Sequence, residues 1–269
     1  MSLDKDYGAY FRVSFPLQTN GSLNYSASHG KNRDYASNWT YANRLDQATN
    51  YSVGVGQDGS TFTANSFLTH QASSATVNLS ASYRDKEFFN VGAGIRGGYT
   101  LTAKGMDLHR VNGLGQSRIL IDTDDIAGVP MRGYGVPTIS NRFGVAVTPD
   151  VRNYYRNNIS IDLNKLPENV DSLDTVQGIT VTQGAIGYQR FALTSGAKDM
   201  VTIVLPNNKF PQFGAEVRNE KGVITGIVGE SGRTYLTGMA ADRKMMIESD
   251  QCQFTIPEDF STQNKFTCQ

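Results

Sequence analysis

Few residues in this chain have types and spacings that could do chemistry. Gly54-Val-Gly56-Gln-Asp-Gly59 has the glycine spacing of a dinucleotide-binding loop. Such a loop binds a pyrophosphate at the N-terminus of the helix that follows it. Here the next residues, Thr61-Phe-Thr-Ala-Asn, have a β pattern and no helical period. We therefore expect a hairpin turn at this position and no cofactor.

Three acidic residues, Asp122, Asp124 and Asp125, are spaced like the start of a calcium loop. An EF-hand loop needs a glutamate at its twelfth position, and Gly133 stands there instead. A turn after a strand is the better interpretation, so no metal site is predicted.

Nucleophilic chemistry has equally little support. Gly229-Glu-Ser231-Gly232 begins like a nucleophile elbow, but Arg233 stands where the second glycine should be. The three histidines, His29, His70 and His109, are scattered and predict neither a triad nor a metal cluster. The sequence therefore predicts that this chain is not an enzyme.

Cys252 and Cys268 are the only two cysteines. Because both lie near the C-terminus, they fit one disulfide formed in an oxidising compartment. The alternative is two free thiols in a cytosolic protein. A disulfide closing so short a loop would stabilise its domain by roughly 3 kcal/mol.

The composition limits the class of protein. Lys plus Arg and Asp plus Glu both number 25, so the net charge is zero and gives no reason to expect nucleic acid as a partner. Low charge together with many small polar residues and tyrosines is typical of an all-β chain, especially an outer-membrane barrel. No apolar run is long enough for a transmembrane helix. The first seven residues do not resemble a signal peptide.

The first hundred residues show a sustained period of two, which predicts β-strands. Apolar residues alternate with Asn, Ser, Thr and Gly in this region, and turn residues separate the strands. The expected strands are 11–17, 22–28, 35–41, 50–55, a less regular 61–69, 75–83, 89–96 and a last strand at 98–104. A neutral polar face and aromatic residues near strand ends favour a membrane barrel wall. A soluble β-sandwich or β-helix is the alternative.

The remaining residues contain shorter strand patterns and frequent glycine turns, which suggest compact sandwiches. Their motifs resemble those of fimbrial outer-membrane ushers, the pores of chaperone–usher pilus assembly. The resemblance runs almost continuously over 117–269. It rests on these elements: Gly144-Val-Ala146-Val147, Tyr154 with Asn157 and Asp162, Gly184-Ala185-Ile186, Phe213-Gly214-Ala215, the hairpin from Gly226 to Gly238, and the final cysteine pair.

This resemblance implies an all-β fold in which partial transmembrane β-barrel strands are followed by two small periplasmic β-sandwich domains. The expected domains are 1–112, 113–205 and 206–269. The implied location is the bacterial outer membrane, with the sandwiches in the periplasm. An usher has many more strands, a plug domain and an N-terminal domain, so we expect a fragment that does not export pili by itself.

The implied function is to hold chaperone–pilin subunit complexes and to support their assembly and secretion through the pore. The expected partners are those complexes and outer-membrane lipid. A small sandwich can bind a partner through an exposed apolar patch, and Phe210, Phe213 and Tyr235 are the candidates, with at least one of them expected in the core. An alternative is an eight-strand outer-membrane barrel, a structural protein or pore, with a periplasmic tail.

Overall fold

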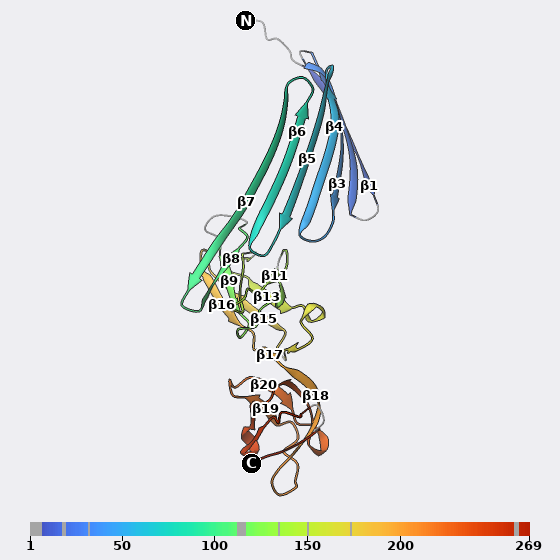
Figure 1. Ribbon diagram of the computed structural model, residues 1–269. Coiled ribbons are helices and arrows are strands. Elements are labelled where there is room, and N and C mark those ends of the chain that lie inside the picture. The colour runs from blue at the N-terminus through green and yellow to red at the C-terminus, as the bar shows by residue number, and fades with distance from the viewer. Residues whose placement is uncertain are drawn as a thin grey trace. The chain divides into compact units, whose positions relative to one another are not determined.

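The computed structural model describes residues 7–17, 20–31, 33–111, 117–133, 135–149, 151–172, 174–260 and 264–269 (Figure 1). Within these ranges the regular secondary structure consists of strands and three short 3-10 turns, η1 (Leu163–Lys165), η2 (Glu230–Gly232) and η3 (Glu248–Asp250). The all-β prediction is therefore confirmed. No helix in the described part of the chain is both long and apolar enough to cross a membrane.

The chain forms two compact units. One contains Met1–Tyr99 with Leu108–Leu114, and the other contains Thr100–Asp107 with Gly115–Gln269. The domain boundary expected at residue 112 lies outside the described residues, as do residues 1–6, where a signal peptide was considered.

The first unit is built on an eight-stranded antiparallel meander in which every strand pairs with its neighbour in sequence. Its strands are β1 (Gly8–Leu17), β2 (Gly21–Gly30), β3 (Arg33–Arg44), β4 (Thr49–Asp58), β5 (Thr61–Gln71), β6 (Ala75–Arg84), β7 (Phe88–Thr102) and β8 (Gly105–His109). The glycine motif at 54–59 forms the end of β4 and the turn to β5, with Gly59 in the left-handed region. It is a hairpin, as the sequence predicts.

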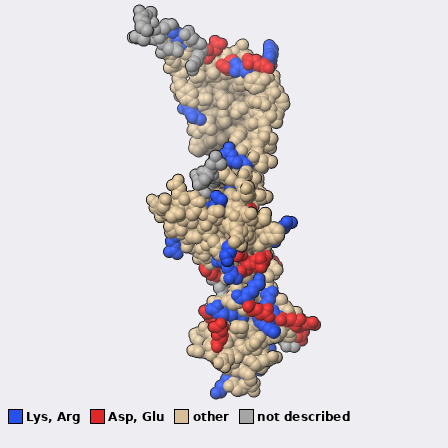
Figure 2. All heavy atoms as spheres, turned by 90° about the vertical axis from the view of Figure 1, so that its left-hand side faces the viewer, with Lys and Arg blue, Asp and Glu red and all other residues tan. Residues whose placement is uncertain are grey.

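The register of these strands separates apolar from polar side chains, because successive side chains point to opposite faces of a sheet. One cross-strand row is entirely apolar: Val13, Tyr25, Trp39, Val55, Ala64, Tyr83 and Phe89. A row on the other face is Ser14, Asn24, Thr40, Gly54, Asn65, Ser82 and Asn90. Figure 2 shows that few Lys, Arg, Asp or Glu side chains lie on the visible face of this sheet.

Two features of the sheet differ from the expectation. Phe67 pairs with Ser52 and lies on the polar face, which explains why residues 61–69 alternate less regularly. The strands expected at 89–96 and 98–104 are one strand, β7, because Gly97 continues the ladder opposite Ala75 instead of forming a turn. The eighth strand is Gly105–His109.

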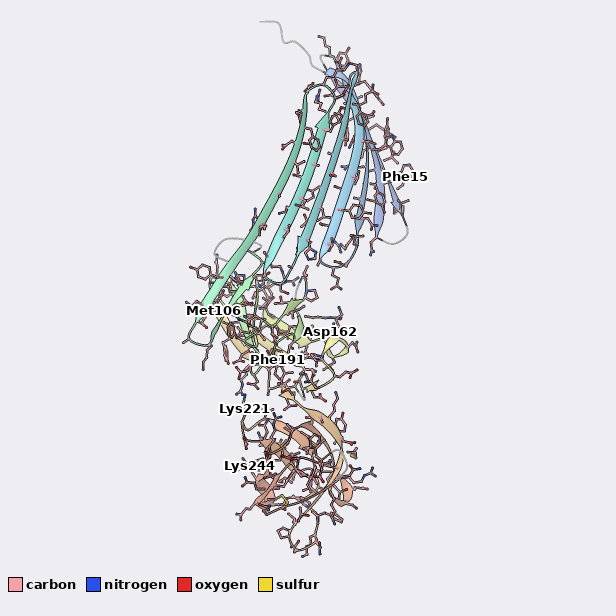
Figure 3. The ribbon with its side chains drawn as sticks, viewed as in Figure 1. Phe15, Met106, Asp162, Phe191, Lys221 and Lys244 are labelled. Atoms are coloured by element: carbon pink, nitrogen blue, oxygen red, sulfur yellow. A yellow bond between two sulfur atoms is a disulfide. The ribbon has the colours of Figure 1, made fainter. Side chains whose placement is uncertain are left out.

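The first sandwich follows, with sheets β11-β10-β13-β15 and β12-β9-β16 and the pair β14-β17. Its strands are β9 (Arg118–Asp122), β10 (Pro130–Arg132), β11 (Thr138–Ile139), β12 (Val145–Thr148), β13 (Arg156–Ile161), β14 (Val170–Asp171), β15 (Val176–Thr180), β16 (Ile186–Arg190) and β17 (Thr194–Ser195). Its core includes Ile119, Ile121, Ile159 and Phe191, and Figure 3 labels Phe191 there.

The end of the β7–β8 hairpin packs against this first sandwich. The Asp107 carboxylate is buried and accepts hydrogen bonds from the Val147 backbone N–H at 2.8 Å and from Asn141 Nδ2 at 2.9 Å. A Cβ on Gly105 would lie 2.9 Å from Val145. Val145 and Val147 form a small buried cluster with Leu120 on that side of the sandwich, which explains why Thr100–Asp107 belong to the second unit.

The C-terminal sandwich has the sheets β21-β18-β24 and β20-β19-β22-β23. Its strands are β18 (Ala197–Val204), β19 (Glu216–Asn219), β20 (Ile224–Ile227), β21 (Arg233–Met239), β22 (Lys244–Ile247), β23 (Cys252–Thr255) and β24 (Lys265–Thr267). The two sheets enclose a separate core that includes Ile203, Val217, Leu236, Met245 and Phe254. Because β18 belongs to this sandwich, the domain boundary expected between residues 205 and 206 is wrong, and the C-terminal sandwich begins near residue 197.

Candidate partner-binding surface

The three aromatic residues predicted to bind a partner all lie on the surface of the C-terminal sandwich. Phe210 and Tyr235 are each 49% exposed, and Phe213 is 73% exposed. The expectation that at least one of them belongs to the core is therefore wrong. Tyr235 points outward because its neighbours in β21, Thr234 and Leu236, are the residues that face the core.

Tyr235 lies in an apolar row that crosses three strands. Met200 of β18 pairs with Tyr235 and is also exposed. On the other side, Val228 and Thr234 form an antiparallel bridge and are both buried. In the antiparallel register set by that bridge, Ile227 and Tyr235 are the next pair of residues. Both are exposed, so their side chains point to the outer face of the sandwich. We call Met200, Tyr235 and Ile227 the apolar row.

The two phenylalanines adjoin the strands that form this row. Gly214, next to Phe213, donates a 2.8 Å backbone hydrogen bond to Val228. The ring of Phe210 lies beside Gly232, where an added Cβ would come within 2.9 Å of Phe210 Cδ1. Gly232 directly precedes β21. The ring of Phe210 and the backbone next to Phe213 therefore lie near the start of β21, close to the apolar row.

The sequence alone gave no reason to choose Met200 or Ile227. Each is a single aliphatic residue at an outward position of a short strand, where isolated apolar residues are common. Only the pairing of β18, β20 and β21 brings them beside Tyr235.

The disulfide lies inside the C-terminal sandwich. Cys252 and Cys268 are bonded, with their Cα atoms 5.1 Å apart, and both are buried. Cys252 begins β23 in one sheet, and Cys268 directly follows β24 in the other, so the bond joins the two sheets. Phe254 and Phe266, from the same two strands, stack with ring centroids 5.6 Å apart.

The acidic residues considered as a calcium loop form a turn. Asp124 and Asp125 are both in the left-handed region, and the Ile126 N–H donates to the Thr123 carbonyl at 3.1 Å. These are the features of a type I′ turn. Lys221 of the C-terminal sandwich contacts Asp125 at 3.4 Å. No group of three or more potential metal-ligating side chains is present among the described residues.

Side chains of β16 hold this turn in place. Tyr188 donates a 2.8 Å hydrogen bond to Asp122, and Arg190 Nε lies 2.6 Å from Asp124. Burial and the bond to Asp122 raise the pKa of Tyr188 to about 12. Hydrogen bonding to the Asp124 carboxylate likewise raises the pKa of Arg190. These contacts have a structural role in the first sandwich.

Comparison with known proteins identifies the class to which this fold belongs. Residues 2–191 match the family model described as outer membrane usher protein, and residues 200–256 match the PapC C-terminal domain. The first match covers well over half of the chain. The chain therefore belongs to the outer membrane usher family.

Individual relatives agree with this assignment. The chain is 40% identical over 242 residues to YfcU of Escherichia coli strain K12, covering 90% of this chain and 27% of that protein. It is 34% identical over 259 residues to the outer membrane usher protein PapC of E. coli, covering 93% of this chain and 30% of PapC. The chain thus spans less than a third of the length of these relatives.

A solved structure shows the same fold. The chain aligns with a chain of the E. coli P pilus tip assembly intermediate PapC-PapD-PapK-PapG with a TM-score of 0.70 and 30% identity. The alignment covers 99% of this chain and 34% of the other.

Proposed function

We propose that the chain acts as the C-terminal part of an outer-membrane usher. In this proposal residues 1–112 supply strands of the transmembrane barrel, and two periplasmic sandwiches, whose strands span 118–195 and 197–267, hold chaperone–pilin subunit complexes during pilus assembly and secretion. Family membership supports the general role, and the solved relative was captured in a pilus tip assembly intermediate.

The two faces of the eight-stranded sheet support the membrane part of the proposal. The row with Val13, Trp39 and Phe89 would face lipid, and the row with Asn24, Thr40 and Asn65 would face a water-filled lumen. Transmembrane β-barrels have this alternation of apolar outward and polar inward residues.

The apolar row is the observation that most supports partner binding. Met200 and Tyr235 are paired on one sheet, and Ile227 lies beside the isolated bridge that joins the end of β20 to β21. The ring of Phe210 lies beside Gly232, at the start of β21. Exposed apolar patches of this kind mark protein interaction sites, and aromatic anchors supply much of the binding energy at interfaces. Binding here would use surface burial and would need no covalent chemistry.

Titration of the full chain in detergent with chaperone–pilin subunit complexes from its source organism tests the proposal, with the bare chaperone as a control. We expect saturable binding of the complex that Tyr235→Ser and Met200→Ser each weaken by roughly ten-fold. Leu163→Ser is the matched control, because Leu163 is an exposed apolar residue outside the patch. Absence of binding by the wild-type chain would refute the proposed role.

A further inference from the structure

The β7–β8 hairpin has one buried face and one exposed face. Thr100, Asp107 and His109 are buried, and the residues that alternate with them are apolar and exposed. Because successive side chains of a strand point to opposite faces, the exposed residues share one side of the hairpin, which we call the outer hairpin face. Figure 3 labels Met106, one of its members. The four members and their exposed fractions are Tyr99 at 76%, Leu101 at 69%, Met106 at 53% and Leu108 at 61%.

The other face of the hairpin is covered by the first sandwich. Besides the contacts of the buried Asp107, Lys104 Nζ at the hairpin turn lies 5.6 Å from the centre of the Tyr188 ring. Asn141 Nδ2 donates to the Met106 carbonyl at 2.9 Å. These contacts hold the hairpin on the sandwich and leave its outer face exposed.

The outer hairpin face continues the apolar face of the eight-stranded sheet along one strand. Alternate residues of β7 from Phe89 to Leu101 point to the same side. Gly97 pairs with Ala75, the first residue of β6, and β7 continues beyond that pair (Figure 1). From Phe89 to Tyr99 there are about eleven residues, which is the length of a tilted strand that spans a bilayer. With Phe89 at one surface of the hydrocarbon layer, Tyr99 therefore reaches the other surface.

Leu101 and Met106 then lie just outside the hydrocarbon layer. The Thr102 hydroxyl donates to the Gly105 carbonyl at 3.2 Å across the hairpin turn, which places Met106 beside Leu101. Two residues beyond Tyr99 advance the strand by about 6.6 Å, or about 5 Å along the membrane normal at a tilt of about 40°. The headgroup layer on each side of the hydrocarbon is roughly 5–8 Å thick. Both side chains therefore fall within that layer.

The chemistry of the outer hairpin face fits lipid better than a protein partner. Residues 97–108 contain two charged residues, Lys104 at the turn and Asp107, which is buried on the other face. Among the four members of the outer face, the Tyr99 hydroxyl is the only polar side-chain group. Protein interfaces make about one hydrogen bond per 100–200 Å², which this face does not supply. Tyrosine beside apolar residues is typical of the membrane–water interface.

We propose that the outer hairpin face lies in the phospholipid headgroup layer of the membrane and anchors the first sandwich there. This inference rests on the proposed function, because it requires the apolar face of the eight-stranded sheet to contact lipid. It adds a lipid contact outside the spanning part of the strands, made by the hairpin that packs against the sandwich.

Quenching of tryptophan fluorescence in vesicles tests this inference. Trp39 is the only tryptophan, so Trp39→Phe gives a background into which Leu101→Trp and Met106→Trp are introduced one at a time. Both sites are exposed, so the larger side chain does not disturb a core. The full chain is inserted into phosphatidylcholine vesicles whose acyl chains carry bromine either near the headgroups or near the bilayer centre. Bromine quenches only a tryptophan close to it, and heat-modifiable gel migration shows that each variant is inserted.

We expect Leu101→Trp and Met106→Trp to lose fluorescence mainly to bromine near the headgroups. Ile95→Trp is the control for the spanning part of β7, because Ile95 is exposed and pairs with Val77 within the sheet. It should lose fluorescence mainly to bromine near the bilayer centre. Phe213→Trp, at an exposed site of the C-terminal sandwich, should lose none to either lipid.

The outcomes separate this inference from the proposed function. If Ile95→Trp is quenched and neither hairpin variant is, the inference is wrong and the membrane part of the proposed function stands. A change in hairpin fluorescence that appears only on adding chaperone–pilin subunit complexes would assign the face to a protein and overturn the inference. Equal quenching of Phe213→Trp would show adsorption without a specific site and would also overturn it. No quenching of Ile95→Trp would refute both.

Discussion

Removal of the disulfide tests whether the C-terminal sandwich opens as a unit of its own. Cys252 and Cys268 are 16 residues apart and join the two sheets of that sandwich. The perturbation is the double substitution Cys252→Ala with Cys268→Ala, and reduction of the wild-type chain is a second route to the same state. Both cysteines are buried, so alanine keeps the sites apolar.

The expected magnitude follows from the length of the loop. Cross-linking a loop of this size removes enough conformational freedom from the unfolded chain to stabilise the folded state by about 3 kcal/mol. Losing the cross-link should therefore speed amide exchange through opening of the sandwich by about 100-fold. The measurement is hydrogen exchange on the full chain, with peptides resolved by mass.

The effect should be confined to 197–269, because the C-terminal core shares no residue with the core of the first sandwich. Peptides from 117–191 and from 7–99 serve as internal controls. A change below about three-fold in 197–269 would contradict the loop-entropy argument. An equal change in 117–191 would show that the two sandwiches open together, against the separation of their cores.

Three further predictions concern other parts of the chain. Gly144 and Gly128 both have positive φ, but a Cβ on Gly144 would lie 2.5 Å from Asp125 Cα, whereas one on Gly128 would meet nothing within 4 Å. We expect Gly128→Ala to cost about 1 kcal/mol and Gly144→Ala about 2 kcal/mol more. Hydrogen exchange of 117–149 measures both, and equal losses would contradict the steric argument. Tyr188 has a pKa raised to about 12, above the usual value of roughly 10. The folded state therefore favours the neutral Tyr188 hydroxyl. The stabilisation from this hydroxyl should be complete below about pH 10 and should disappear as the pH rises toward about 12. The difference in melting temperature between wild type and Tyr188→Phe, followed by circular dichroism, should shrink over that interval, and a constant difference would argue against it. Val91 lies on the apolar face of β7 and Asn90 on the polar face. If the apolar face contacts lipid, Val91→Lys should destabilise insertion by about 2 kcal/mol and Asn90→Lys by much less. The folded fraction in phosphatidylcholine vesicles, read from heat-modifiable gel migration, tests this, and similar losses for both variants would refute the assignment of faces.

The sequence was sufficient to predict the two-faced sheet and the disulfide. Side chains alternate strictly along a strand, so Val13, Trp39 and Phe89 had to share a face once the strands paired as neighbours. Only one disulfide is possible with two cysteines. Local patterns of this kind do not depend on the rest of the fold.

Strand ends were harder to predict. Gly97-Gly98 looks like a turn in the sequence, yet Gly97 pairs with Ala75 within β7. Glycine is compatible with a turn and with a strand, so only the pairing with β6 decides. The following hairpin then extends to the first sandwich, where the buried Asp107 receives a hydrogen bond from Val147.

The binding surfaces depended on contacts that no local pattern contains. The sequence by itself determined the strands, the two faces of the sheet, the single disulfide and the family resemblance, because each follows from neighbouring residues or from a recognisable motif. The tertiary structure alone placed Met200 and Ile227 beside Tyr235. The reason is physical: which side chains share an exposed surface depends on which strands pair and in which register, and the residues of one strand do not determine its partners.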